Sequence, residues 1–339
     1  MSSELKTYVA HLKVMLSGLR TRALSSPSGA MDGMSHLVVE SIWRSTQYLS
    51  GSTSNRVPFE IVYALKHALK DWDLNDAIVT TSLLKSSDFL CERANNAPKA
   101  VAAMLRGPVP HDLVQIAFPE IFQHYPLFCT PLYHEIGHYI EDRHSYVAFV
   151  VAGSDVDELW RLLPDRAHFP SLDVAARRRI VRNHLTEYFC DLFSASYVGT
   201  CAGFYIGQLD VDQVVTDTHP LISSRLAVID KFTSQCADPI VDLLKRCALD
   251  AEGNQLLRQR FKQIDVAPCF TDARPVDIAC LEEMHGIFPA ALDFIANGEA
   301  PANCSSSDHT DDLTKLVNDL VEKSIRNFMI TKAWNEHLV

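Results

Sequence analysis

Residues 131–144 read PLYHEIGHYIEDRH and hold three histidines and three acidic residues. His134 and His138 are four residues apart, so a helix places both imidazoles on one face, where one metal ion can take a nitrogen from each. Glu135 then lies beside the ion without binding it, and its carboxylate can accept a proton from metal-bound water. This H-E-x-x-H spacing is typical of hydrolytic zinc sites.

The third ligand has two candidates, and they imply different families. His144 follows His138 with metzincin spacing, but Glu141 stands where metzincins usually carry the glycine that lets the chain turn back to the metal. If the helix runs on, His144, which is six residues after His138 at about 100° per residue, lies on a different face of the helix. The other candidate is Glu187, one helical turn before Asp191, so that one carboxylate can bind the metal while the other accepts a hydrogen bond from a ligand histidine.

A third motif follows these two along the chain. The segment DTHPLISSRLAVI contains His219, Pro220 and Arg225. The order H-E-x-x-H, E-x-x-x-D, H-P-x-x-x-x-R resembles the gluzincins, which are thermolysin-like zinc peptidases. The third motif is similar to the T-H-P-x-x-x-x-R segment of CAAX prenyl protease and HtpX-like peptidases. The resemblance covers residues 126–232, without the transmembrane helices that flank these motifs in the membrane members.

This resemblance implies a role for each motif residue. The implied zinc ligands are His134, His138 and Glu187, and Asp191 would orient one of the two ligand histidines. His219 would donate a hydrogen bond to the oxyanion of the tetrahedral intermediate. Arg225 would fix the loop that carries His219, or a substrate carbonyl.

The expected activity is therefore hydrolysis of peptide bonds in protein or peptide substrates, with Zn²⁺ as cofactor. Zinc lowers the pKa of its bound water toward about 7, and Glu135 takes the proton and later passes it to the leaving amine. Three alternatives stay open. They are a metzincin-like peptidase with His144 as third ligand, a catalytically inactive zinc-binding regulatory protein, and a metal-free helical interaction module.

The elements that must position these residues are mostly helical, because glycine is sparse and apolar residues recur with helical spacing. One long helix is expected to begin at Ser171 as its N-cap and to end at Gly199. Two β-branched runs, residues 76–84 and 112–121, predict a small sheet just before the HEIGH helix. The predicted fold class is mainly α (α+β), a zincin-like core with a small β-sheet beside the HEIGH helix.

Further helices are expected at both ends of the chain. The first 24 residues and residues 311–330 both have the apolar spacing of an amphipathic helix. The predicted domains are a helical region over residues 1–110, the catalytic core over 111–235 and a second helical region over 236–339.

The composition limits the classes of partner. A formal net charge of −11 disfavours a general nucleic-acid-binding surface. The sequence contains no run of about 18 apolar residues, so it does not predict a membrane-spanning helix. Nine cysteines without a C-x-x-C pair favour reduced thiols in the cytoplasm, where most would be buried small apolar residues. The regions outside the motifs leave room for inhibition, substrate selection, a regulatory partner or a homo-oligomer.

Overall fold

The computed structural model of the protein describes residues 3–25, 33–51, 59–75, 77–93, 112–208, 214–298 and 309–337. The chain forms two compact units, unit 1 with Met1–Val57 and Asp73–Glu120 and unit 2 with Pro58–Trp72 and Ile121–Val339. The predicted domain boundaries after residues 110 and 235 stay predictions. The expected boundary after residue 110 lies outside the described residues, and residues 236–339 share unit 2 with the HEIGH helix.

Unit 1 combines two helices with a three-stranded sheet. The helices are α1 (Ser3–Ser25) and α2 (Gly33–Gly51), and the strands are β1 (Ile78–Leu84), β2 (Leu90–Arg93) and β3 (Leu113–Pro119). The central strand β3 pairs parallel with β1 and antiparallel with β2. Both predicted β-branched runs form strands, so the small sheet is confirmed, whereas β2 was not foreseen.

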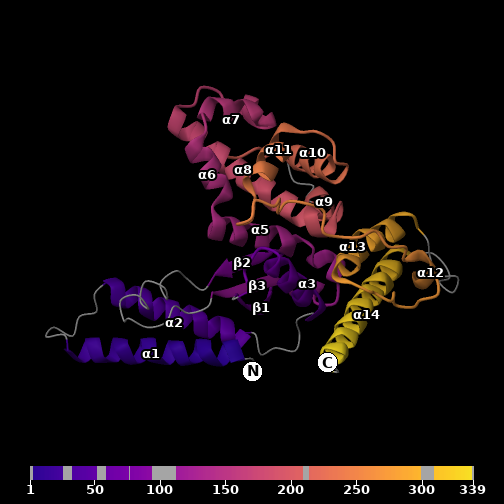
Figure 1. Ribbon diagram of the computed structural model, residues 1–339, viewed down its shortest axis with the longest axis horizontal. Coiled ribbons are helices and arrows are strands. Elements are labelled where there is room, and N and C mark those ends of the chain that lie inside the picture. Colours follow the sequence, from indigo (N-terminus) through magenta and orange to yellow (C-terminus); the bar gives the residue numbers. More distant parts are fainter. Residues whose placement is uncertain are drawn as a thin grey trace. The chain divides into compact units, whose positions relative to one another are not determined.

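The regular elements of unit 2 are helices, namely α3 and those from η2 to α14, and most of them are labelled in Figure 1. Its elements before the HEIGH helix are α3 (Phe59–Lys70) and the 3-10 helix η2 (Pro126–Cys129), and η1 (Glu120–Phe122) crosses the boundary between the units. The elements that follow are α5 (Pro131–His144), α6 (Tyr146–Gly153), α7 (Val156–Leu162), η3 (Pro164–His168), α8 (Val174–Val198), α9 (Cys201–Gln208), α10 (Ile222–Thr233), α11 (Pro239–Cys247), α12 (Ala267–Phe270), α13 (Leu281–Ala296) and α14 (His309–His337). The mainly α class with a small sheet is therefore confirmed.

Helix α8 is the central element of unit 2. It packs against α5, α6, α7, α9, α10, α11 and α13, and its residues from Glu187 to Val198 are buried without interruption. A helix that is buried all round needs apolar residues on every face, and α8 supplies them in its second half. Its few buried charges are therefore exceptions that need partners.

The ends of α8 follow local capping rules. Gly199 ends the helix in a positive-φ conformation (φ 56°), as predicted. The predicted N-cap was wrong, because Asp173 and not Ser171 caps the first turn, and its carboxylate accepts a 2.7 Å hydrogen bond from the Ala176 amide. Ser171 lies outside the helix in a left-handed conformation (φ 57°) and cannot serve as the N-cap.

Helices α5 and α8 approach closely at Gly137. A Cβ atom on this residue would lie 2.8 Å from the Cα atom of Cys190, a distance that real side chains do not tolerate. The absence of a side chain at Gly137 therefore lets α8 approach α5 this closely. This contact brings the H-E-x-x-H and E-x-x-x-D motifs against each other.

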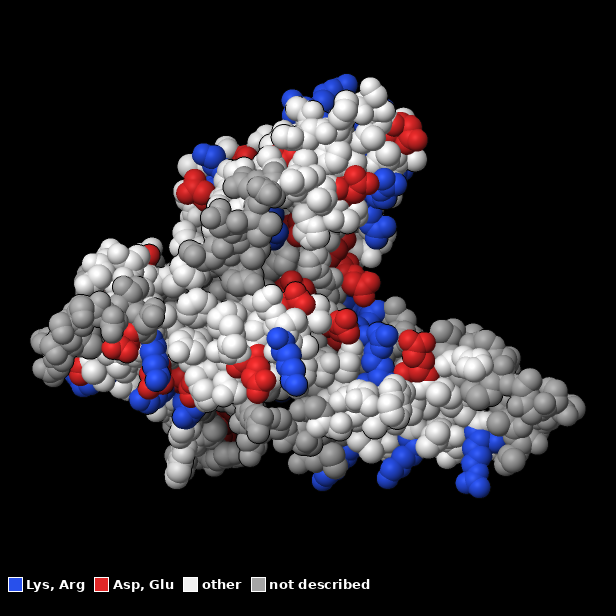
Figure 2. Space-filling model, turned by 180° about the vertical axis from the view of Figure 1, so that it is seen from behind, with Lys and Arg blue, Asp and Glu red and all other residues white. Residues whose placement is uncertain are grey.

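Two features relate to the predicted absence of nucleic-acid and membrane partners: the charges on the surface and the lengths of the helices. On the face shown in Figure 2, the coloured acidic and basic side chains are interspersed. Among the helices of the described ranges, none is both long and apolar enough to cross a membrane.

Candidate metal centre

The two motif histidines project from α5 toward one carboxylate on α8. The His134 and His138 rings lie 4.9 Å apart between centroids, with planes at 83°. Nε2 of His134 is 3.4 Å from Oε2 of Glu187, and Nε2 of His138 is 3.4 Å from Oε1 of the same carboxylate. Two nitrogens and a carboxylate, all common ligands of Zn²⁺, therefore face one another.

A second carboxylate fixes the orientation of His134. Oδ1 of the fully buried Asp191 accepts a 2.9 Å hydrogen bond from Nδ1 of His134. Because Nδ1 donates to Asp191, Nε2 is the nitrogen left to bind a metal ion, and it faces Glu187. This is the arrangement that a histidine ligand and its supporting carboxylate adopt in metal sites.

Arg225 from α10 completes this buried network. Its Nε and Nη2 donate to Oδ2 and Oδ1 of Asp191 at 2.8 and 2.7 Å, and its Nη1 lies 3.6 Å from Oε2 of Glu187. Nη2 is also 3.3 Å from Nδ1 of His134, but both atoms carry protons and share Asp191 as their acceptor. Arg225 therefore contacts Asp191 directly and lies within reach of Glu187.

His219 reaches the cluster from the loop before α10. Its Nε2 lies 3.7 Å from Oε1 of Glu187, and its Nδ1 is 2.8 Å from the Thr218 hydroxyl oxygen. The His219 side chain is 58% exposed and that of His138 is 34% exposed, against 7% for Glu187. The cluster is thus buried on the Asp191 side and open to solvent on the side of His138 and His219.

At His134 and Glu187, the hydrogen bonds and charges of the cluster oppose the effect of burial on the pKa. Burial alone would lower the pKa of His134, but its hydrogen bond to Asp191 and its contact with the Glu187 carboxylate raise that pKa to about 9. Burial would raise the pKa of Glu187, but the His134 contact and the charges of His134 and Arg225 lower it to about 2. Burial, followed by the charge of His134, lowers the pKa of His138 to about 4. The cluster therefore holds an ionised carboxylate beside at least one neutral imidazole.

Glu135, the predicted base, follows His134 on α5 and is partly buried. Burial raises the pKa of its carboxyl, the charge of His134 lowers it, and the nearby Glu187 raises it again. A carboxylate with a raised pKa is a better proton acceptor than an ordinary surface glutamate.

Cys190 joins this cluster, although the sequence alone predicts an ordinary buried thiol at this position. Its Sγ and one ring nitrogen from each of His134 and His138 all lie within 4.8 Å of one another. These three side chains form a group that could bind a metal ion. A signal was present in the sequence, because Cys190 lies three residues after Glu187, close to its face of α8. Cys190 also packs beneath Gly137.

His144 lies elsewhere along α5. The helix runs through Glu141 and ends at His144, whose ring stacks on Tyr146 at 5.2 Å and 15°. Glu141 is buried, and its carboxylate accepts hydrogen bonds from the amides of Val147 and Ala148 at the start of α6. A glutamate that continues one helix and caps the next performs a structural role that glycine could not.

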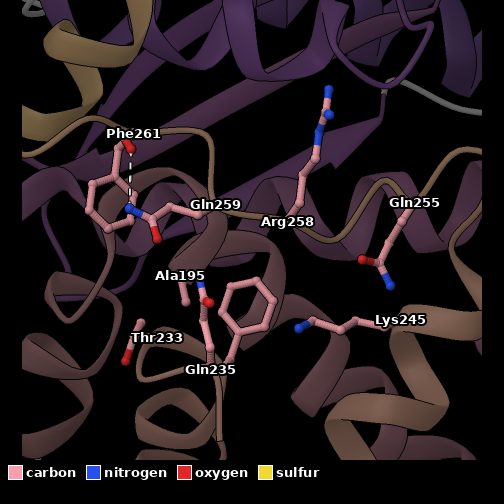
Figure 3. Close-up of a pocket in the computed structure, with 9 residues that line it drawn as sticks. Ala195, Thr233, Gln235, Lys245, Gln255, Arg258, Gln259 and Phe261 are labelled. Carbon is pink, nitrogen blue, oxygen red and sulfur yellow. Dashed lines mark hydrogen bonds between the residues drawn. The ribbon is translucent and has the colours of Figure 1, made fainter.

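A separate cavity of about 210 Å³ lies farther along α8, beside Ala195 (Figure 3). Its wall contains amide, hydroxyl, cationic and aromatic side chains, without a histidine, cysteine or carboxylate. The Lys245 ammonium lies 5.1 Å from the centre of the Phe232 ring, and the Arg258 side chain extends away from Lys245. This cavity lacks metal ligands, so the α5–α8 cluster is the candidate metal centre.

No protein-family model, curated protein or solved structure matches this chain.

Proposed function

We propose that this protein is a zinc-dependent peptidase with a gluzincin-type core that hydrolyses peptide bonds in protein or peptide substrates. The observation that carries the proposal is the convergence of His134 Nε2 and His138 Nε2 on the two oxygens of Glu187, each at 3.4 Å. His134, His138 and Glu187 would hold the zinc, leaving one position for water.

The cluster fits a cation in one further respect. Oε2 of Glu187 is buried and accepts no hydrogen bond from the described residues, since Nε2 of His134 at 3.4 Å is too distant for a well-formed one. A buried carboxylate oxygen without a full partner is costly, and a bound cation removes that cost.

A bound zinc ion would supply Lewis acidity and activate water for attack on a peptide carbonyl. Glu135 accepts the proton of the attacking water and passes it to the leaving amine. The Thr218 hydroxyl can donate to Nδ1 of His219 at 2.8 Å, which leaves the proton on Nε2 to be donated to the developing oxyanion. Asp191 holds the His134 ring, and Arg225 compensates the buried charge of Asp191.

The test uses the purified protein, fluorescent casein and a zinc chelator. Glu135→Gln keeps the side-chain shape but removes the base, so we expect retained zinc and a loss of turnover of roughly 100- to 10,000-fold. Glu158→Gln, an exposed change on α7, is the matched control and should behave like wild type. Wild-type turnover in Glu135→Gln, or hydrolysis that survives complete zinc removal, contradicts the proposal.

One observation favours a second candidate, a zinc-binding regulatory protein without turnover. If the Cys190 thiolate bound the metal together with both histidines and Glu187, four protein ligands would close the position that water needs. Cobalt(II) substitution separates the two candidates. A thiolate-to-cobalt charge-transfer band that disappears in Cys190→Ser, combined with no casein hydrolysis, would favour the regulatory protein, whereas an active enzyme without that band favours the peptidase.

A further inference from the structure

We infer that Asp165 is a positioning residue that holds both His219 and Arg225 at the metal cluster. The inference deepens the proposed peptidase function and rests on it for the catalytic consequence. Asp165 lies in η3, outside all three sequence motifs, and is 3% exposed. A buried carboxylate requires partners, and those of Asp165 lie at the beginning of α10.

Helix α10 has no capping side chain of its own. Its N-cap residue is Leu221, which makes no side-chain hydrogen bond to the first turn. Asp165 supplies the missing acceptor from a distant part of the chain. Its Oδ2 accepts from the Leu221 amide at 2.9 Å, and its Oδ1 accepts from the Ser224 hydroxyl at 2.7 Å. A negative charge here is also favoured by the helix dipole.

The segment that Asp165 binds carries one residue of the metal cluster before Leu221 and another after Ser224. His219 is two residues before Leu221, and its Nε2 reaches within 3.7 Å of Oε1 of Glu187. Arg225 directly follows Ser224 and donates to both oxygens of Asp191. One buried carboxylate thus fixes the stretch of backbone from which both side chains extend to the cluster.

The other contacts of the loop before α10 hold it on the N-terminal side of His219, at residues 216 and 217. Nε2 of His184 donates to the Thr216 carbonyl at 2.8 Å, and the Asn183 amide donates to the Asp217 carbonyl at 3.0 Å. Arg179 pairs with Asp217, but both side chains are more than half exposed, and exposed pairs contribute little. Asp165 provides the buried anchor on the other side of His219.

The proposal separates positioning from simple helix stability. Asp165→Ala removes both acceptors, whereas Asp165→Asn can accept from the Leu221 amide with Oδ1 and donate to the Ser224 hydroxyl with Nδ2. The matched control is Asp238→Ala, because Asp238 caps α11 through the amides of Ile240 and Val241. Helix α11 carries no residue of the cluster.

The first measurement is independent of turnover. Solution NMR follows the ring signals of His219 and the solvent exchange of the Arg225 Nε proton. In Asp165→Ala we expect the His219 signals to move to those of a free histidine and Arg225 exchange to accelerate by more than about tenfold, since its hydrogen bond to Asp191 opens more often. Asp165→Asn and Asp238→Ala should retain the wild-type values. Unchanged signals in Asp165→Ala, or equal changes in Asp238→Ala, overturn the inference.

The second measurement is peptide hydrolysis with zinc-loaded protein. Asp165→Ala should retain one zinc per chain, lose roughly 10- to 100-fold in kcat with little change in KM, and recover in Asp165→Asn, because His219 acts on the transition state. If Asp165→Ala does not fold, Ser224→Ala removes one of the two bonds and should show the same changes at smaller size. If wild type hydrolyses nothing while the NMR changes appear, the peptidase proposal fails and the positioning role stands. Wild-type kcat in Asp165→Ala with an active wild type contradicts the catalytic consequence.

Discussion

Two histidines of unit 2, the largely buried His134 and the fully buried His285, lie in opposite environments. His285 on α13 is 2% exposed, and its Nδ1 shares a 3.0 Å hydrogen bond with the hydroxyl of Tyr133, the residue that precedes His134 on α5. Burial, with smaller contributions from the charges of His67 and Arg260, lowers the pKa of His285 to about 3. A hydrogen bond to Asp191 and a contact with the Glu187 carboxylate instead raise the pKa of His134 to about 9.

The difference shows what turns a buried histidine into a candidate ligand. His285 lies among aromatic rings, with Tyr133 at 5.8 Å and Tyr197 at 5.0 Å between centroids, and these surroundings favour its neutral form. His134 faces two carboxylates, which favour any cation placed between them, a proton or a metal ion. Burial is common to both residues, so the carboxylates of α8 distinguish the candidate metal centre.

The largest expected effect tests which side chains bind the metal. His134→Ala and His138→Ala should each abolish stoichiometric zinc, and Glu187→Ala should lower zinc affinity as severely, because each removes a proposed ligand. His144→Ala should retain zinc, since its ring stacks on Tyr146. Zinc content after dialysis, measured by atomic spectroscopy, checks this ranking.

The opposite ranking would overturn the assignment. Zinc lost in His144→Ala and retained in Glu187→Ala would favour the metzincin-like alternative. Zinc lost in Cys190→Ser and retained in Glu187→Ala would favour a His–His–Cys site.

The next effect in size concerns the carboxylate that orients His134. Asp191→Asn keeps the shape but removes the negative charge that accepts from both His134 and Arg225. We expect zinc affinity to fall by roughly 10- to 100-fold without loss of the site. Competition with a chromophoric chelator measures this change, and an affinity equal to that of wild type would show that Asp191 is not needed for orientation.

The close contact of α5 and α8 predicts a smaller loss. In Gly137→Ala the added methyl group would meet the backbone of Cys190 at 2.8 Å, so the helices must separate. We expect the free energy of unfolding to fall by about 1–3 kcal/mol, as for other overpacked cores. Gly153→Ala is the control, because its added methyl group would meet no atom of the described residues within 4 Å, and it should not destabilise the protein. Chemical denaturation compares the two, and equal stabilities would remove Gly137 as the reason for the approach.

The last prediction concerns the pH dependence of stability at His285, measured between pH 7 and pH 5. Its folded-state pKa of about 3 lies below the unfolded value of 6.5, so the unfolded state binds the proton first as the pH falls. Stability is therefore complete above about pH 6.5 and decreases toward pH 3, by at most about 1.4 kcal/mol per pH unit. Denaturation at pH 7, 6 and 5 should give a shallower slope for His285→Gln than for wild type. Equal slopes would show that His285 is not held neutral.

Local spacing in the sequence determined much of this protein. A helix repeats every 3.6 residues, so residues four apart lie on one face. The numbering alone therefore placed His134 and His138 together on one helix, and Glu187 and Asp191 together on a second helix. The end of α8 at Gly199 and the strands β1 and β3 followed from equally local preferences. The mainly helical class needed no tertiary information.

The tertiary structure decided what local spacing cannot reach. The Tyr133–His285 hydrogen bond joins residues 152 apart, the bidentate Arg225–Asp191 pair joins residues 34 apart, and the Asp165–Leu221 anchor joins residues 56 apart. Cys190 was three positions from a predicted ligand, yet its approach to the histidines depends on how closely α5 packs at Gly137. Helical periodicity sets positions within a few turns, whereas the distance between two helices depends on which side chains pack between them.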